Sequence, residues 1–171
     1  MTGGALSGQK KYDEATPVFN ESLALAMELF GNDHPGTIAT RAWLASTIYR
    51  KGDFEGALPL MKQVVEDTKR VMGAEHQHVA SGINNLAGCV GAMGNFEEAK
   101  ALYKEALEIT KNAIGEEHPH VATGLNNLAK LLHGHGDTEE ATRLGKQALA
   151  ILEKALGPDH PSTQCARRDW G

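Results

Sequence analysis

Four histidines recur at one position of a regular spacing, and imidazole is the first group to consider for metal chemistry. The position is filled every 42 residues, by His34, His76, His118 and His160. A zinc site needs its ligands to converge on one ion, whereas a repeated position spreads them along the chain. His118 with His120, and His133 with His135, could come closer, but no carboxylate–histidine helix motif accompanies them. We therefore expect these histidines to make hydrogen bonds in loops or at helix starts, with no metal and no cofactor.

No other set of residues has the spacing of a catalytic or phosphate-binding motif. The chain lacks a nucleophile elbow, a phosphate loop and a dinucleotide fingerprint. The glycines of the 91–94 and 134–136 runs fall at the same place in successive copies of a repeat, which predicts turns rather than phosphate cradles. These observations argue against an enzyme.

Charge and composition limit the kinds of partner. A formal charge of −5 over 171 residues offers no footprint for nucleic acid or for an anionic membrane. No apolar run is long enough to cross a bilayer, and residues 1–11 lack the pattern of a signal peptide. Cys89 and Cys165 are far apart at different repeat positions, so a reducing compartment fits best. We expect a cytoplasmic protein.

The same 42-residue step defines the elements that carry these residues. Within residues 79–114, an apolar stripe with three-and-four spacing predicts one helix, and a longer stripe from Phe96 to Ile114 predicts a second. Gly94 marks the turn between them, and Gly115 suits the left-handed conformation that ends a helix. Small residues such as Ala87 and Ala99 recur where the two helices would cross. An ungapped repeat of this length indicates a solenoid of stacked helix pairs.

These residues carry a resemblance to a known family. The strings Gly115–Ala129 and Phe96–Leu107 resemble the tetratricopeptide repeat, in the longer variant of kinesin light chains and of similar bacterial repeat proteins. The resemblance spans about residues 11–166 and implies an all-α, right-handed superhelical solenoid of antiparallel helix pairs. It is specific for the fold and much less so for the biological role.

The repeat frame predicts a single array over residues 1–171. Its parts are three full repeats at 36–73, 78–115 and 120–157, with partial repeats at 11–31 and 161–171. Residues 1–9 align with the tail of a first-type helix, so we expect a second-type helix to begin at residue 11. We see no polar terminal caps, which solenoids need. The chain is expected to be a fragment of a longer array or a small member that associates with itself through its uncapped ends.

The resemblance also implies a binding face, because first helices line the concave side of such arrays and hold peptides there. Asparagines on that face can clamp a peptide backbone, since one amide both donates and accepts hydrogen bonds. Asn85 and Asn127 should face a common channel, with Asn84 and Asn126 at its edge; the alternative is that one Asn of each pair is a structural residue between repeats. The other candidate groove residues are Arg41, Ser81, Thr123, Lys130 and Trp43.

Two of these candidates leave questions open. Trp43 stands where the later repeats have asparagine, and it could pack on a neighbouring helix or offer an aromatic platform. The kinesin light chain resemblance implies a basic groove for peptides with a tryptophan beside acidic residues. Here Arg41, Arg50 and Lys130 are the possible basic equivalents, too few to predict that ligand.

The best functional interpretation is a non-catalytic adaptor that binds peptide segments of partner proteins. One alternative is a self-assembling structural repeat module whose ends stack on other copies. Another is a sensor or autoinhibitory repeat segment of a larger multidomain signalling protein. Growth of mass with concentration would indicate self-assembly, and the full-length gene product would identify a fragment.

Overall fold

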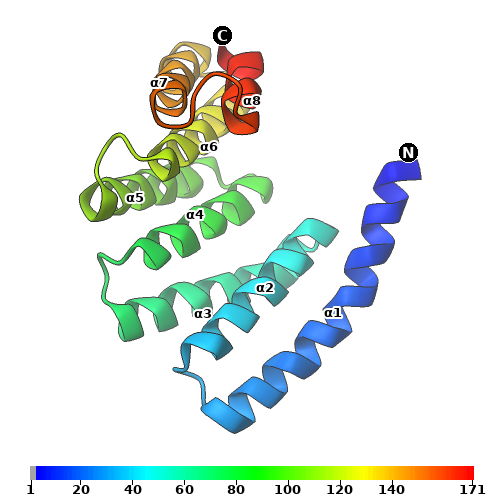
Figure 1. The fold of residues 1–171 in the computed structure, drawn as a ribbon. Helices are drawn as coiled ribbons and strands as arrows, with labels where there is room; N and C mark the ends of the chain where they lie inside the picture. Colours follow the sequence, from blue (N-terminus) through cyan, green and yellow to red (C-terminus); the bar gives the residue numbers. More distant parts are fainter. Residues whose placement is uncertain (1–2) are drawn as a thin grey trace. The chain divides into compact units, whose positions relative to one another are not determined.

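The computed structural model describes the backbone of residues 3–171 and the side chains of residues 11–171, and all regular structure in this part of the chain is α-helical. The helices are α1 (Gly3–Phe30), α2 (Pro35–Lys51), α3 (Phe54–Met72), α4 (Gln77–Ala92), α5 (Phe96–Ile114), α6 (Pro119–His135), α7 (Thr138–Leu156) and α8 (Pro161–Trp170), coloured in chain order in Figure 1. They form two compact units, Met1–Ala74 with α1–α3 and Glu75–Gly171 with α4–α8. The helical repeat predicted from the sequence is confirmed.

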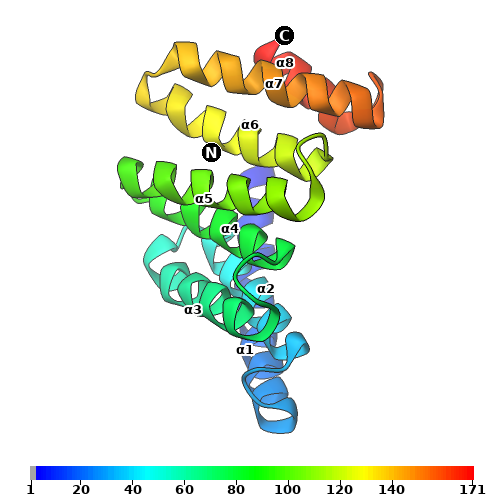
Figure 2. The ribbon, with the colours of Figure 1, turned by 90° about the vertical axis from the view of Figure 1, so that its left-hand side faces the viewer.

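Each unit is a series of antiparallel neighbours. In the first unit α2 packs on both α1 and α3; in the second, α4 packs on α5 and α6 on α7, while α5–α6 and α7–α8 join the pairs. Figure 2 shows α4 to α7 following one another in the second unit, with α8 behind α7 in this view. None of the helices in the described part of the chain combines the length and apolar character that a bilayer crossing requires.

Glycines at half-repeat intervals set the helix ends. Seven of them, 21 residues apart from Gly31 to Gly157, have φ between +82° and +96°, a region that L side chains rarely adopt. Gly52 and Gly136 end α2 and α6 in the left-handed conformation, each with its backbone N–H donating to carbonyls of the last turn. Glycine is therefore required at these positions by the backbone.

The four repeated histidines are helix caps. His34, His76, His118 and His160 each precede a first-type helix, and each Nδ1 accepts a hydrogen bond from the backbone N–H two residues on, at 3.1–3.2 Å. This satisfies one of the unpaired donors of the first turn, as the loop and helix-start interpretation predicted. The caps of the second-type helices are less uniform: Asp53 accepts from Gly56 N–H, whereas Asn95 and Asp137 form no side-chain cap hydrogen bond.

The predicted start of the first described helix is wrong. We expected a second-type helix to begin at residue 11, after the tail of another helix, but α1 is continuous from Gly3 to Phe30. The reason is local: Lys10 occupies the repeat position that Gly52, Gly94 and Gly136 fill in the turns. Without glycine there, nothing favours the left-handed residue that would end a helix, and the chain continues as one.

The crossing alanines are buried as predicted. Ala57, Ala87, Ala99, Ala129 and Ala141 are at most 1% exposed, because a larger side chain would separate the two helices of a pair. In the second unit the apolar cluster is continuous from Ala87 to Trp170 and includes Leu125, Leu128, Leu132 and Leu144. This cluster fixes the spacing of α4 and α6, which carry the candidate site.

Helix α8 packs on α7 with a large residue on α8 opposite a small residue on α7. Trp170 stands at the repeat position of Leu44, Leu86 and Leu128, and it lies against Gly145 of α7, where a Cβ atom would come within 2.2 Å of the indole. The earlier second-type helices have Phe19, Met61 and Tyr103 at the position of Gly145. The missing side chain makes room for the indole. The rest of α8 is polar on its exposed side, with Gln164, Arg167 and Arg168.

Candidate functional site

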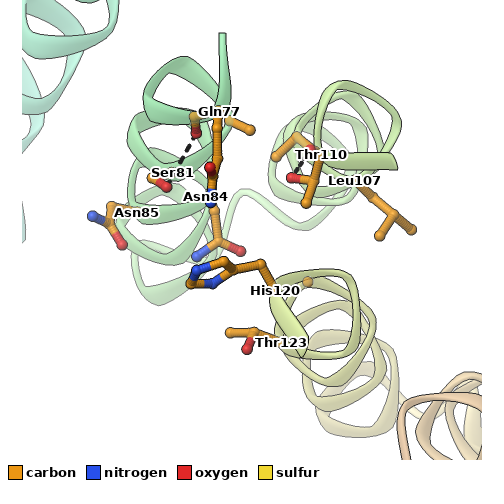
Figure 3. Close-up of a pocket in the computed structure, with 11 residues that line it drawn as sticks. Gln77, Ser81, Asn84, Asn85, Leu107, Thr110, His120 and Thr123 are labelled. Carbon is orange, nitrogen blue, oxygen red and sulfur yellow. Dashed lines mark hydrogen bonds between the residues drawn. The ribbon is translucent and has the colours of Figure 1, made fainter. Parts of the chain in front are cut away.

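A small cleft lies between the first-type helices α4 and α6 of the second unit (Figure 3). Its volume is about 160 Å³, and Ala106, Leu107 and Thr110 of α5 are part of its lining. The walls carry polar side chains without Lys, Arg, Asp or Glu: Gln77, Ser81, Asn84 and Asn85 from α4, and His120 and Thr123 from α6. A drug-sized ligand needs roughly 300–1,000 Å³, so the cleft suits one or two amino-acid side chains.

The asparagines of the two repeats do not superpose in their contacts. Asn127 Nδ2 donates to Asn84 Oδ1 at 3.1 Å, which joins α6 to α4. Figure 3 shows Asn84 pointing toward His120, whereas Asn85 projects from the side of α4 turned away from α5 and is exposed. Asn127 thus meets Asn84 across the repeats, and a common channel faced by Asn85 and Asn127 stays a prediction. In the first pair Asn84 has a structural bond, and in the second pair both Asn126 and Asn127 have one.

Asn126 makes a hydrogen bond with Trp170 of α8. Its Oδ1 accepts a hydrogen bond from Trp170 Nε1 at 2.7 Å, and the indole edge meets the ring of His133 at a centroid distance of 6.0 Å. Buried indole N–H groups usually find a partner, and Asn126 is that partner here. Asn126 therefore makes a contact within the second unit, and its place at the edge of a peptide channel stays a prediction.

The remaining α4 and α6 candidates are exposed. Ser81 and Thr123 donate their hydroxyls to carbonyls of their own helices, Gln77 O and Pro119 O, at 3.2 Å each, and keep lone pairs turned outward. Lys130 lies on the same side of α6 as Thr123, and it pairs with Asp169 Oδ2 at 3.1 Å. The Lys130 ammonium holds the pKa of the Asp169 carboxyl below its usual value, and Arg168 adds to the shift.

Arg41, predicted as an exposed groove cation, is instead an interior residue of the first unit. Its side chain is 6% exposed, and Nη1 donates to Asp67 Oδ2 on α3, whose side chain is 1% exposed. Nη2 donates to Asn32 Oδ1 at 3.1 Å. Burying a guanidinium requires a paired carboxylate and satisfied donors. The nearest open surface is a hollow of about 950 Å³ beside α1 and α3, where this network forms part of the lining.

Trp43 is exposed over 64% of its surface, on α2 of the first unit. It occupies the repeat position of Asn85 and Asn127. Of the two interpretations left open by the sequence, packing beneath a neighbouring helix does not fit this exposure. The aromatic platform stays a prediction.

Sequence reasoning missed His120 and Gln77, which the structure adds to the cleft walls. Both follow a helix-capping histidine, and their periodic position could have marked them: His120 lies two residues after His118, and Gln77 directly after His76. The sequence pattern alone predicts only hydrogen bonds in loops or at helix starts for these histidines. In the structure the first turn of a first-type helix also opens onto the cleft.

The repeat is confirmed by comparison with protein families. A family model described as tetratricopeptide repeat matches three overlapping stretches, residues 3–70, 40–111 and 78–154. None of the curated protein sequences matches the chain. Among the described residues, no group of three or more His, Cys, Asp or Glu side chains could hold a metal ion.

Solved structures agree with the family. A kinesin light chain-type protein of Podosopora anserina, built of nearly identical TPR-like repeats, aligns at 26% identity with a TM-score of 0.76, over 97% of this chain and 80% of that one. A variant of that protein aligns at the same identity with a TM-score of 0.77, over 97% and 79% of the two chains. BtubC (BKLC) from P. vanneervenii aligns at 27% identity with a TM-score of 0.80, over 94% of this chain and 64% of its own length.

These neighbours and the helix pairs described above agree on one architecture, the all-α repeat solenoid. The family model covers most of the chain, and the Podosopora anserina neighbour is of the kinesin light chain type with TPR-like repeats. This chain belongs to the tetratricopeptide repeat family and resembles its kinesin light chain-like members.

Proposed function

We propose that this protein is a non-catalytic adaptor whose α4–α6 face binds an extended, uncharged segment of a partner protein. Tetratricopeptide repeats generally mediate protein–protein interactions, which supplies the broad class. The observation that carries the finer proposal is a cleft wall without Lys, Arg, Asp or Glu, formed by Gln77, Ser81, Asn84, Asn85, His120 and Thr123. Amide and hydroxyl groups of this kind pair with peptide N–H and C=O groups.

The size of the cleft supports a peptide over a small ligand. About 160 Å³ accepts one side chain of an extended segment, while the exposed amide of Asn85 and the outward lone pairs of Ser81 and Thr123 meet its backbone. The cleft wall includes no Lys or Arg, so an acidic peptide finds no countercharge inside the cleft. We extend the proposal to a cytoplasmic location, because both cysteines are thiols.

A selection experiment tests the proposal. The full chain is used to select peptides from a random library, and the selected peptides are expected to be uncharged at their central positions. Asn85→Ala with Thr123→Ala should weaken binding about tenfold, because each lost hydrogen bond is worth roughly 0.5–1.5 kcal/mol. Both side chains are exposed, so helicity and melting temperature should stay unchanged.

The matched control is Lys146→Ala with Gln147→Ala, two exposed positions on α7 away from the cleft. It should leave affinity unchanged. Selected peptides that are mainly acidic, or that bind the Asn85→Ala, Thr123→Ala variant as well as the original chain, would place the binding surface elsewhere.

A further inference from the structure

Helix α1 has a second apolar face that no part of the first unit covers. Leu23, 9% exposed, and Ala26, whose carbonyl accepts from Thr37 Oγ1 at 3.2 Å, belong to the face against α2. Val18, Leu25 and Leu29 are 61%, 54% and 63% exposed. At 3.6 residues per turn these three side chains fall within about 40° of arc, so they form one continuous stripe. A continuous exposed apolar stripe of this kind marks an interaction surface.

The repeat frame shows what kind of element fits this face. Leu25 occupies the position of Asp67 in α3, and Asp67 contacts Arg41 of α2, the first helix of its own pair. The same position is Ile109 in α5, which is 7% exposed. Ala15, at the crossing position, is only half-buried, whereas Ala57, Ala99 and Ala141 are fully buried under a first helix. The face of α1 is thus shaped to receive a helix.

Charge selects the partner of this face. Glu21 and Glu28, seven residues apart and both exposed, line one flank of the stripe. Ser22 and Ala15 line the other flank, and small residues there let a second backbone approach closely. We propose that the Val18–Leu25–Leu29 face of α1 binds an amphipathic helix of a partner protein, with an apolar stripe flanked by lysine or arginine.

A second copy of this chain fits the face less well. If two α1 helices packed antiparallel about a two-fold axis, the glutamate flank of one would meet the glutamate flank of the other, which is repulsive. If α8 of another copy took the place of a first helix, Arg167, at the repeat position of Arg41, would lie opposite Leu25. That contact would bury a guanidinium without the carboxylate that Asp67 supplies to Arg41.

Designed helical peptides test the proposal. One peptide carries leucines at the spacing of Val18, Leu25 and Leu29, flanked by lysines; its twin carries glutamates in place of the lysines. We expect the full chain to bind the lysine peptide, as measured by fluorescence anisotropy, and to bind the twin at least about tenfold more weakly. Hydrogen exchange should show new protection in residues 18–29.

Variants of the chain locate the contact. Leu25→Ser with Leu29→Ser should weaken binding of the lysine peptide by at least about tenfold, because apolar burial on the peptide is lost. Glu21→Lys with Glu28→Lys should reverse the preference toward the glutamate twin. Leu156→Ser, at a 38% exposed leucine of α7, is the matched control and should change nothing. All five altered positions are exposed, so the melting temperature should be preserved.

Three results would overturn the proposal: failure to bind the lysine peptide, equal affinity for the two peptides, or binding that Leu25→Ser with Leu29→Ser leaves intact. A fourth is growth of mass with concentration in light scattering that the same pair of substitutions abolishes, since this would show that a second copy covers the face. The surface is separate from the α4–α6 cleft, so the two proposals stand or fall independently.

Discussion

The two units fill the same pair of repeat positions with opposite chemistry. In the first unit, Arg41 of α2 meets Asp67 of α3 as a buried ion pair. In the second, the corresponding residues are Ile83 with Ile109, and Leu125 with Ile151; all are apolar, three are buried, and Ile151 is partly buried against the apolar cluster. One position of one repeat thus tolerates either a charged pair or an apolar pair, provided that both members change together.

The buried ion pair needs additional hydrogen-bond partners, which the apolar pair does not need. Asp67 also accepts from Gln63 Nε2 at 2.9 Å and from Arg70 Nη2 at 2.8 Å, and Arg41 also donates to Asn32. Arg70 in turn pairs with Asp33 in the loop after α1. These contacts tie that loop to α3, so the network fixes a local geometry while its desolvation offsets much of its attraction.

The largest predicted effect comes from breaking the buried pair. Asp67→Ala leaves Arg41 buried without a countercharge and should cost about 3–5 kcal/mol in the free energy of unfolding of the first unit. Hydrogen exchange in α2 and α3, followed over a denaturant series, measures this loss separately from α4–α8.

The second unit's own residues supply the matched variant. Arg41→Ile with Asp67→Ile should range from neutral to about 1–4 kcal/mol more stable, because both desolvation penalties disappear. If Asp67→Ala cost less than about 1 kcal/mol, or if the paired isoleucines were as damaging as the single alanine, the contrast between the units would have no energetic basis.

On the apolar side of the comparison, Leu128→Ala should destabilise the second unit by about 2–5 kcal/mol. Leu128 is 2% exposed within the apolar cluster, so truncation loses transfer free energy and leaves a cavity. Leu156→Ala, at the exposed end of α7, should stay within about 0.5 kcal/mol. Thermal unfolding followed by circular dichroism distinguishes the two; equal effects would contradict the assigned helix faces.

Local signals made much of this fold predictable. The turn glycines, the capping histidines and the crossing alanines act within a few residues of themselves, so their spacing alone indicates the helices and their order. The candidate site was harder to predict from the sequence. Arg41 looked like a groove cation because its partner Asp67 is 26 residues away; the signal was that both positions change together from isoleucine or leucine to opposite charges.

The asparagines illustrate the same limit at the candidate site. Asn84 and Asn126 occupy equivalent positions, yet one bonds to Asn127 and the other to Trp170. Sequence periodicity predicts equivalent directions, but the neighbour that meets each side chain depends on packing between elements. Trp170 replaces a leucine at the third recurrence of its position, and only the structure shows that its N–H then takes the Asn126 oxygen.

A smaller effect should follow from changing the fit of α8. Gly145→Ala places a methyl group about where the Trp170 ring lies, with 2.2 Å between Cβ and Cδ2, and should cost about 1–3 kcal/mol. Combining it with Trp170→Leu, the residue type of the other repeats, should cost less than the sum of the two single changes. A double-mutant cycle on melting curves measures that coupling, and strict additivity would show that the two residues do not pack together.

The inter-repeat amide contact is expected to matter less again. Asn127→Ala removes the donor to Asn84 Oδ1 and should cost about 0.5–1.5 kcal/mol of the free energy of unfolding. Asn85→Ala, at the exposed neighbour of Asn84, should remain within about 0.5 kcal/mol and serves as the control. Denaturant titration resolves the difference; an equal loss in both variants would assign no stability to the Asn84–Asn127 bond.

The smallest effect concerns the exposed ion pair of Lys130 and Asp169 in the second unit. Like the buried pair of the first unit, it joins a cationic side chain to a carboxylate. Lys130 keeps the pKa of Asp169 below its ordinary value, so the pair stabilises the fold at neutral pH. That contribution is lost as the pH falls through the depressed pKa, when the folded carboxylate takes up its proton. Because Lys130 is half exposed, the pair should contribute about 0–1 kcal/mol and weaken further in salt.

Asp169→Asn should therefore lower stability slightly at neutral pH and leave it unchanged once both forms are uncharged at that position. Melting temperatures of the two proteins, compared from neutral to acid pH, should converge; a gap that widened with acid would reverse the assigned sign of the interaction.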